Sequence, residues 1–173
     1  MPGDQAEVSF ERVAERHMPM LFAWLSEPHV RQWWGDPDAE LGSIRDGCES
    51  GEVDGFIFLI AGEPAGYIQS WVPSQYDEEP WAKDLSAETP GVDIFVGPSE
   101  MTGKGVAALA LRAFAARLFE EGAVRIVIDP DAGNRRALRA YAKAGFVPFG
   151  EWIDESGRTL LMELTRTEFE RNG

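Results

Sequence analysis

The chain has 173 residues, of which 44% are hydrophobic and 11% aromatic, and its formal net charge at pH 7 is −14. This length and apolar content predict one folded domain over residues 1–173 and exclude a disordered chain. The excess of acidic residues disfavours binding to nucleic-acid phosphates and favours a polycationic partner.

The first residues of the chain, 1–7, lack the basic and apolar regions of a signal peptide, so we expect a cytoplasmic protein. The longest apolar run, Phe56 to Ala61, has the length of a strand and is too short to span a membrane. A single cysteine, Cys48, excludes an internal disulfide and is expected to be inert. Two histidines, His17 and His29, are too few for a structural zinc site and are expected in surface or helix-cap roles.

The first half of the chain carries one strand pattern, three helical patterns and then two strand patterns. Pro28 favours the start of the second helix and Gly35 its end. Ala61–Pro64 reads as a tight turn that joins the last two strands into an antiparallel hairpin. In chain order the predicted elements are Val8–Val13, Arg16–Leu25, Pro28–Trp34, Asp38–Glu49, Asp54–Ile60 and Ala65–Val72.

An acidic loop follows the hairpin. Between Tyr76 and Glu88 it places several carboxylates around Trp81, namely those of Asp77, Glu78, Glu79, Asp84 and Glu88. Long loops of this kind are uncommon unless they bind something, and an aromatic ring among carboxylates suits an amphipathic cation such as an amino sugar. A solvated loop without a ligand explains the same composition equally well.

The second half alternates strands and helices. A strand, a glycine-rich turn, a long helix and a buried strand come in succession, which implies a parallel crossover. A second helix and a final pair of strands complete the chain. The predicted ranges are Gly91–Val96, the turn Met101–Ala107, a helix to Glu121, Val124–Ile128, Asn134–Lys143, Phe146–Ile153 and Thr159–Thr165.

The glycine-rich turn predicts an anion site. Gly103 and Gly105 let the backbone approach a ligand closely, and the N–H groups of the following helix start favour a diphosphate. Val106 stands where a P-loop needs Ser or Thr, and Ala108 replaces the third glycine of a dinucleotide-binding turn. A helix start with nothing bound is the alternative interpretation.

Four segments together resemble the Gcn5-related N-acetyltransferase (GNAT) superfamily, and they span most of the chain: Trp24–Gly35, Gly62–Trp71, Gly91–Ala107 and Asp129–Phe146. The resemblance implies an α+β (mixed α/β) fold, with a central, mostly antiparallel sheet that contains a splayed parallel strand pair and is flanked by helices. Within the superfamily the tryptophan pair, the Gly-Tyr-x-Gln-Ser strand and the Gly-x-Asp sequence are similar to aminoglycoside 6′-N-acetyltransferases. This similarity implies acetyl-CoA as co-substrate, no metal, a cationic amine such as kanamycin as substrate, antibiotic resistance as outcome, and a monomer or weak homodimer.

The resemblance also implies which residues bind the cofactor. The diphosphate would lie on the amides of Thr102–Ala107, and the pantetheine arm between the strands Asp93–Val96 and Val124–Ile128. The implied contacts are Phe95, Val96, Thr102, Gly103, Lys104, Gly105, Val106, Ala107, Asn134 and Ala137. An N-cap role at the start of the following helix explains Asn134 equally well.

Two residues are implied as catalytic. Tyr141 would donate a proton to the departing thiolate, and Asp93 would act as base or orient the amine. The structural alternative for Tyr141 is an aromatic side chain that only packs in the core. For Asp93 it is a carboxylate at a strand end that faces solvent or caps the strand. The implied substrate contacts are Trp34, Asp77, Glu79, Trp81, Asp93 and Asp129, although Asp129 could instead cap the turn at Pro130.

Several questions stay open at this stage. The base can be Asp93, Asp129 or water, and Trp33 and Trp34 are expected to divide core packing and substrate contact, with Trp34 at the substrate. Alternative functions are acylation of siderophore hydroxylysine, acetylation of protein N-termini, or a silent CoA-binding domain.

Overall fold

The computed structural model describes residues 6–172, so most of the segment used for the signal-peptide expectation lies outside the described residues. The chain divides into two compact units. The first unit runs up to Gln69 and resumes over Ile94–Ala110, and the second comprises Ser70–Asp93 and the chain from Leu111 onward. Two of the boundaries fall inside strands and the third inside a helix, so these three elements are each shared by both units.

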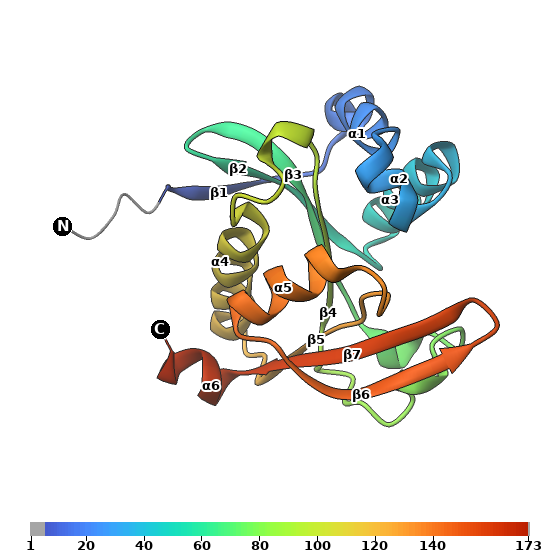
Figure 1. Cartoon of the computed structure of the whole chain (residues 1–173), viewed down its shortest axis with the longest axis vertical. Coiled ribbons are helices and arrows are strands. Elements are labelled where there is room, and N and C mark those ends of the chain that lie inside the picture. The colour runs from blue at the N-terminus through green and yellow to red at the C-terminus, as the bar shows by residue number, and fades with distance from the viewer. Residues whose placement is uncertain (1–5, 173) are drawn as a thin grey trace. The chain divides into compact units, whose positions relative to one another are not determined.

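Seven strands form one sheet in the order β1-β2-β3-β4-β5-β7-β6 (Figure 1). β1 pairs antiparallel with β2, and β7 pairs antiparallel with both β5 and β6. β4 and β5 are parallel, with Gly91 opposite Val127. This mixed sheet confirms the predicted fold class. The strands are Val8–Arg12, Asp54–Ile60, Glu63–Trp71, Gly91–Val96, Arg125–Ile128, Val147–Asp154 and Gly157–Thr165 for β1 to β7.

The first unit contains β1, β2, most of β3, the end of β4 and three helices that lie together in Figure 1. The helices are α1 (Met18–Leu25), α2 (Pro28–Trp34) and α3 (Pro37–Ser50). Leu21, Leu25 and Ile57 are fully buried between these helices and the strands. Apolar residues that recur at helical spacing on α1 and at alternate positions on the strands therefore build one core.

The hairpin between β2 and β3 is tighter than predicted. Ala61 and Gly62 both adopt positive φ, 51° and 83°, and these values suit a two-residue turn whose twist matches the flanking strands. β3 therefore begins at Glu63 and not at Ala65, and the predicted four-residue turn is wrong.

His17 is buried, with 5% of its surface exposed, so a surface position for it is wrong. Its Nδ1 accepts the N–H of Ala14 at 2.9 Å, which fits the expected cap role. Because Nδ1 is an acceptor, Nε2 carries the proton and donates to the Glu11 carboxylate, 3.1 Å away.

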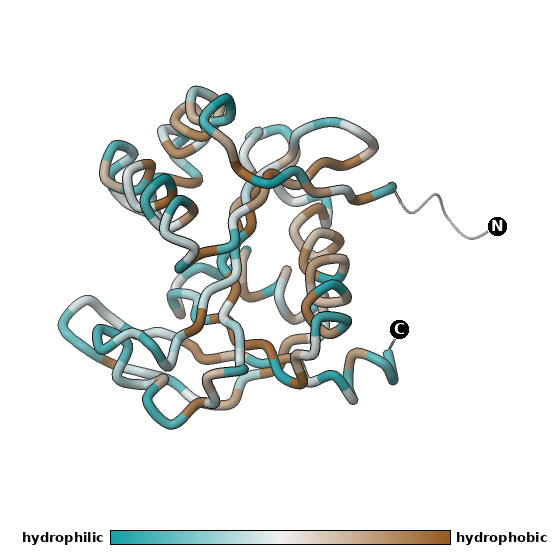
Figure 2. The backbone as a smooth tube through the Cα atoms, turned by 180° about the vertical axis from the view of Figure 1, so that it is seen from behind, coloured by the Kyte–Doolittle hydropathy of each residue, from teal (hydrophilic) through white to brown (hydrophobic). Residues whose placement is uncertain are grey.

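The second unit contains β5 to β7, the last helices and most of α4 (Val106–Glu120), which begins in the first unit. In Figure 2 the tube of α4 is mostly brown with teal interruptions, as expected for a helix rich in Ala and Leu with scattered arginines. α5 (Arg135–Ala144) ends at Gly145, whose φ of 110° is a left-handed cap. A short helix that the sequence pattern did not predict, α6 (Arg166–Arg171), starts where Thr165 Oγ1 accepts the N–H of Glu168 at 3.2 Å.

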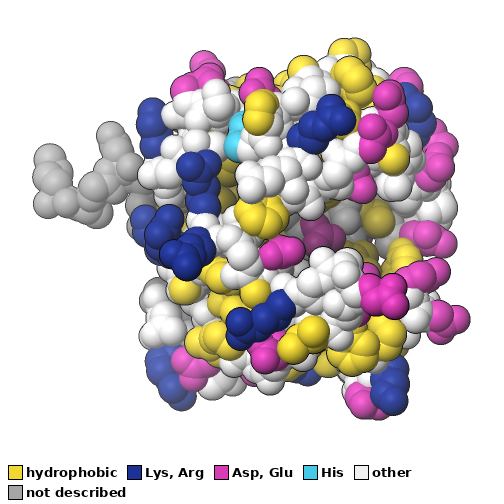
Figure 3. Space-filling model, turned by 45° about the vertical axis from the view of Figure 1, so that its right-hand side comes forward, with side chains coloured by type: hydrophobic (Ala, Val, Ile, Leu, Met, Phe, Trp, Pro, Cys, Tyr) yellow, Lys and Arg dark blue, Asp and Glu magenta, His cyan; other side chains and the backbone are white. Residues whose placement is uncertain are grey.

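Within the described residues, no helix combines the length and the apolar character that crossing a membrane requires. Figure 3 shows acidic side chains spread over much of the face in view, as the net charge of −14 requires.

Candidate active site

The glycine-rich turn has the backbone that the sequence predicted. Gly103 and Gly105 adopt φ of 75° and 77°, in the left-handed region that side chains disfavour. Leu109 N–H donates to the carbonyl of Gly105 at 3.1 Å and opens the helical ladder of α4. The N–H groups of Val106, Ala107 and Ala108 precede that bond and therefore have no acceptor inside the helix. The turn can thus present several amides to an anion.

The space beside this turn is open. A Cβ added to Gly103 would meet no atom within 4 Å, and the side chain of Lys104 is exposed. The turn is stiffened from its own sequence, because Thr102 Oγ1 donates to the carbonyl of Ser99 at 2.7 Å. A rigid turn with an open approach suits a diphosphate, which needs amides fixed in advance.

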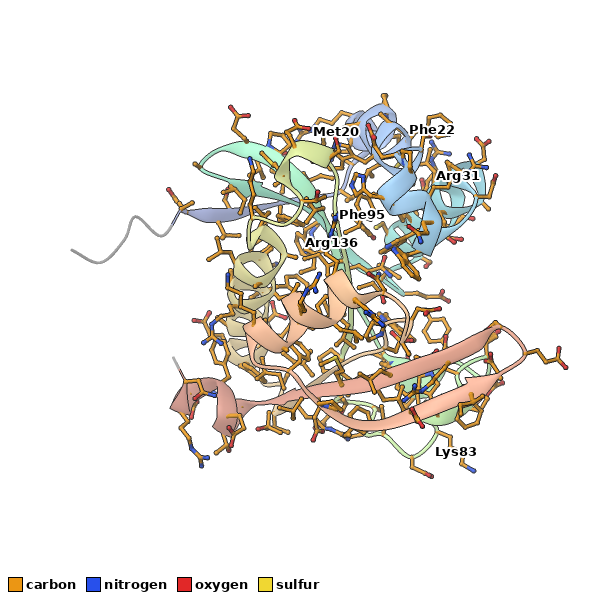
Figure 4. The ribbon with its side chains drawn as sticks, in the orientation of Figure 1. Met20, Phe22, Arg31, Lys83, Phe95 and Arg136 are labelled. Atoms are coloured by element: carbon orange, nitrogen blue, oxygen red, sulfur yellow. The ribbon has the colours of Figure 1, made fainter. Side chains whose placement is uncertain are left out.

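The end of β4 lies among aromatic rings in the first unit. The ring of Phe95, labelled in Figure 4, lies 5.1 Å from that of Trp34 and 5.7 Å from that of Tyr67, centroid to centroid. Trp24 meets the same ring edge-on at 6.3 Å. The Phe95 side chain is therefore a core anchor that holds this stretch of backbone. A cofactor contact by Phe95 stays a prediction.

Trp33 and Trp34 differ in packing, but Trp34 and not Trp33 is the one that packs in the core, which is the reverse of the expectation. Trp34, expected at the substrate, is the half-buried member packed on Phe95 and Tyr67, whereas Trp33 is 39% exposed. A substrate contact by Trp34 stays a prediction.

In the second unit, Asp129 follows β5 and is crowded by protein atoms and by other carboxylates. Burial raises the pKa of the Asp129 carboxyl well above its ordinary value, and the negative charges of Asp93 and Glu79 raise this pKa further. Carboxylates from β4 and from the acidic loop therefore both act on the carboxyl group at the end of β5. Such a group favours a cation strongly, since a bound positive charge would relieve the repulsion.

Tyr141 belongs to the same group. It is 7% exposed on α5, and burial raises the pKa of its phenol above the ordinary value, with Asp93 and then Asp129 as further causes. The hydroxyl therefore keeps its proton throughout the physiological pH range. Both predicted catalytic residues lie in the second unit and influence each other electrostatically.

The acidic loop contributes one carboxylate, that of Glu79, to the group around Asp129. Trp81 Nε1 donates to Glu79 Oε2 at 2.7 Å across the short 3₁₀ turn Pro80–Ala82, and this bond fixes both side chains. Glu79 is the loop residue whose charge reaches Asp129, whereas Asp77 is exposed and is not among the groups acting on Asp129 or Tyr141. The structure thus distinguishes Glu79 from the other acidic residues of the loop, which the sequence did not.

Asn134 has the capping role that was its structural alternative. Its Oδ1 accepts the N–H of Ala137 at 3.2 Å and starts α5. This bond uses the side-chain oxygen and leaves the amide donor for a second partner. Cofactor contacts by Asn134 and Ala137 stay predictions.

The structure does not favour a nucleophilic cysteine or a metal centre as an alternative site. Burial raises the pKa of the Cys48 thiol, which keeps it protonated and weakly nucleophilic. Among the residues that the structure describes, no three His, Cys, Asp or Glu side chains gather as a metal site would need. His29 makes an interaction that the sequence did not suggest, because its Nε2 lies 2.9 Å from the carbonyl oxygen of Val96.

Comparison with known proteins identifies relatives over nearly the whole chain. The family profile described as "Acetyltransferase (GNAT) domain" matches residues 13–153. Aminoglycoside N(6′)-acetyltransferase type 1 of Klebsiella pneumoniae is 31% identical over 172 residues, covering 95% of this chain and 86% of the relative. The crystal structure of aminoglycoside acetyltransferase AAC(6′)-Ib in complex with coenzyme A and kanamycin superposes with a TM-score of 0.86 at 30% identity, covering 95% of this chain and 98% of that one. A complex of AAC(6′)-Ib with ribostamycin and coenzyme A matches at the same TM-score of 0.86.

Proposed function

The chain belongs to the GNAT acetyltransferase family, and on that premise we propose that it transfers the acetyl group of acetyl-CoA to the 6′-amino group of aminoglycosides. The relatives that carry this activity in their names match 95% of the chain. The observation that carries the proposal is the group of Asp93, Asp129 and Glu79 with the buried Tyr141. Acetyl transfer to an amine needs a cation-binding site, a proton acceptor and a proton donor, and this group can supply all three.

Acetyl-CoA supplies an activated acyl group as a thioester. The residues proposed to hold it are the amides of Thr102–Ala107 for the diphosphate and the main chain of Val96 for the pantetheine arm. Phe95 is proposed to contribute by anchoring that backbone through its packed ring. Asn134 and Ala137 are proposed to contribute from α5. The positive φ of Gly103 and Gly105 and the open space beside Gly103 support this assignment.

The carboxylates bind the amine and help it lose its proton. A polyammonium substrate is drawn to Asp93, Asp129 and Glu79, and Trp81 holds Glu79 in place by their hydrogen bond. Asp93 accepts or relays the proton of the reacting ammonium, so that the nitrogen lone pair is free to attack the thioester carbon. Trp34 and Asp77 are proposed as further substrate contacts.

Tyr141 completes the transfer. As the new C–N bond forms and the C–S bond breaks, the electron pair of that bond goes to sulfur, and the phenol proton neutralises it. The charges of Asp93 and Asp129 raise the phenol pKa in the free protein. A bound polycation offsets these charges, so the phenol becomes a better acid when the substrate is present.

Gly105→Val is expected to weaken coenzyme A binding at least tenfold. At φ of 77° a β-branched residue is strained, so the turn must change its backbone and its amides lose their common direction. Calorimetry with coenzyme A measures the loss. Gly122→Val is the matched control, because Gly122 also has positive φ, 111°, but lies just beyond the other end of α4. Equal affinities for wild type and Gly105→Val would contradict the diphosphate assignment.

Asp129→Asn is expected to stabilise the folded protein at neutral pH while lowering activity. With its pKa raised, the folded chain keeps the Asp129 proton to a higher pH than the unfolded chain does. Folding stability therefore falls as pH rises from the ordinary aspartate pKa of about 3.9 through the raised value. An amide avoids this loss, so we expect a gain of about 1 kcal/mol at pH 7.5, roughly 2–4 °C in melting temperature.

Thermal melts at two pH values check this sign. The gain should vanish near pH 3, where both states hold the proton. Asp84→Asn, an exposed acid in the same unit, should leave the melting temperature unchanged. A melting temperature that Asp129→Asn lowers at pH 7.5 would contradict the described environment of this carboxyl.

One assay separates the candidate functions. Thiol release from acetyl-CoA is followed with kanamycin, with a matched aminoglycoside that carries a 6′-hydroxyl, with a lysine-type siderophore precursor and with a peptide that has a free N-terminus. Release with kanamycin alone supports 6′-acetylation. Release with the precursor or the peptide alone supports the corresponding alternative. Tight coenzyme A binding without release from any of them supports a silent CoA-binding domain.

The remaining proposals concern the chain as a whole. We propose that residues 1–173 act as one domain, because β3, β4 and α4 each continue from one compact unit into the other. The proposed setting is the cytoplasm, with the chain as a monomer or weak homodimer that binds neither nucleic acid nor a membrane. Ultracentrifugation and a single cooperative unfolding transition test the monomer and the domain assignment.

A further inference from the structure

The carbonyl oxygen of Val96 is bound by a side chain from a distant part of the sequence. His29, the second residue of α2, places Nε2 at 2.9 Å from this oxygen. A carbonyl only accepts, so Nε2 carries the proton and donates. The two residues are 67 positions apart in the sequence, and both belong to the first unit.

This bond lies on the side of β4 that faces away from β3. Gly97 N–H donates to the carbonyl of Ala65 on β3 at 2.9 Å. The carbonyl oxygen of Phe95 also faces β3, since a Cβ added to Gly66 would lie 2.2 Å from it. Successive residues of a strand direct their N–H and C=O groups to opposite sides. The N–H and C=O of Val96 therefore both point away from β3.

The neighbouring side chains leave this backbone little freedom. A Cβ on Gly97 would lie 2.2 Å from the Trp24 ring, so helix α1 packs directly against the main chain there. Phe95 is enclosed by Trp24, Trp34 and Tyr67. His29 adds a polar contact to these aromatic ones. Its hydrogen bond fixes the orientation of the peptide plane that follows Val96.

We propose that His29 is a positioning residue for acetyl transfer. This proposal rests on the proposed function. The hydrogen bond from His29 to Val96 would hold the outward edge of β4 in the conformation that receives the pantetheine and thioester end of acetyl-CoA. Because the histidine occupies the Val96 carbonyl, the N–H on the same edge is the group offered to the ligand. His29 itself does not touch the reacting atoms in this proposal.

The test compares variants that differ in the hydrogen bond. His29→Phe keeps a flat ring without a donor, and His29→Gln keeps a donor on a flexible chain. We expect His29→Phe to weaken coenzyme A binding and to raise the KM for acetyl-CoA, each about tenfold. His29→Gln should restore most of both. The kcat should change less than KM, since Asp93 and Tyr141 are untouched.

Two controls distinguish positioning from a general loss of structure. 3′-Phospho-ADP carries the diphosphate but no pantetheine arm, so its affinity should be equal in wild type and His29→Phe. His17→Gln alters the other histidine of the first unit, which is buried and bonded to Ala14 and Glu11. It should lower the melting temperature and leave coenzyme A affinity unchanged.

The proposal would be overturned by wild-type coenzyme A affinity in His29→Phe, by an equal loss for 3′-phospho-ADP, or by a failure of His29→Gln to restore binding. Should His29→Phe not fold, as judged by circular dichroism, His29→Asn takes its place, because the shorter amide cannot reach the carbonyl. The binding readouts need no turnover. An inactive wild type would therefore refute the proposed function and still leave the role of His29 decided by affinity.

Discussion

Replacing Asp93 by Asn should lower kcat about 100- to 1,000-fold while leaving coenzyme A affinity nearly unchanged. Asp93 lies on β4, and its charge reaches both Asp129 and Tyr141. The amide can hold the substrate amine by a hydrogen bond but cannot take its proton. In the variant, the rate should therefore rise with pH as free amine forms in solution, whereas the wild type should reach a plateau earlier.

Steady-state kinetics between pH 6 and pH 9 check this expectation. Asp84→Asn serves as the matched control, since it makes the same chemical change at an exposed position of the same unit. Its pH–rate profile should coincide with that of the wild type. If Asp93→Asn also kept the wild-type profile and kcat, Asp93 would have a structural role, and Asp129 or water would be the remaining bases.

Tyr141→Phe should lower kcat about 100-fold and leave the affinity for coenzyme A and the folding stability close to wild type. Phenylalanine fills nearly the same buried volume, so the core of the second unit is retained. The lost group is the proton that the departing thiolate requires. Because the buried phenol keeps its proton throughout the physiological range, the loss should be similar at every pH where the wild type is active.

Substrates with different thiol leaving groups sharpen this test. An acetyl thioester of a more acidic thiol needs less protonation, so it should reduce the difference between Tyr141→Phe and wild type. Tyr76→Phe makes the same change in the same unit, next to Trp71, and should keep the wild-type kcat. Unchanged turnover in Tyr141→Phe would remove this residue from the mechanism.

Much of the fold could be predicted because local chemistry determines it. Gly103 and Gly105 mark a turn that requires positive φ. Asn134 begins α5 through its side-chain oxygen, and Gly145 ends it through its left-handed φ. Alternation in the first strand and short apolar runs in the others predicted the strands to within two positions. Errors fell where tertiary pairing extends an element, as at Glu63, where the two-residue turn leaves more residues for β3.

The site was predicted less completely, because its interactions join residues far apart in the sequence. Asp93 and Tyr141 followed from a family resemblance, and the structure adds their mutual electrostatic influence. Nothing in the composition of the acidic loop separates Glu79 from Asp77. The bond between His29 and Val96 depends on how α2 packs beside β4, and a histidine after a proline carries no signal of it.

A crystal structure with coenzyme A and kanamycin bound is the most direct test of the proposed acetyl transfer. We expect the diphosphate on the amides of Thr102–Ala107, the sulfur within hydrogen-bonding distance of the Tyr141 hydroxyl, and the 6′-amino group beside Asp93. A sulfur remote from Tyr141, or kanamycin that presents a different amine to Asp93, would contradict it.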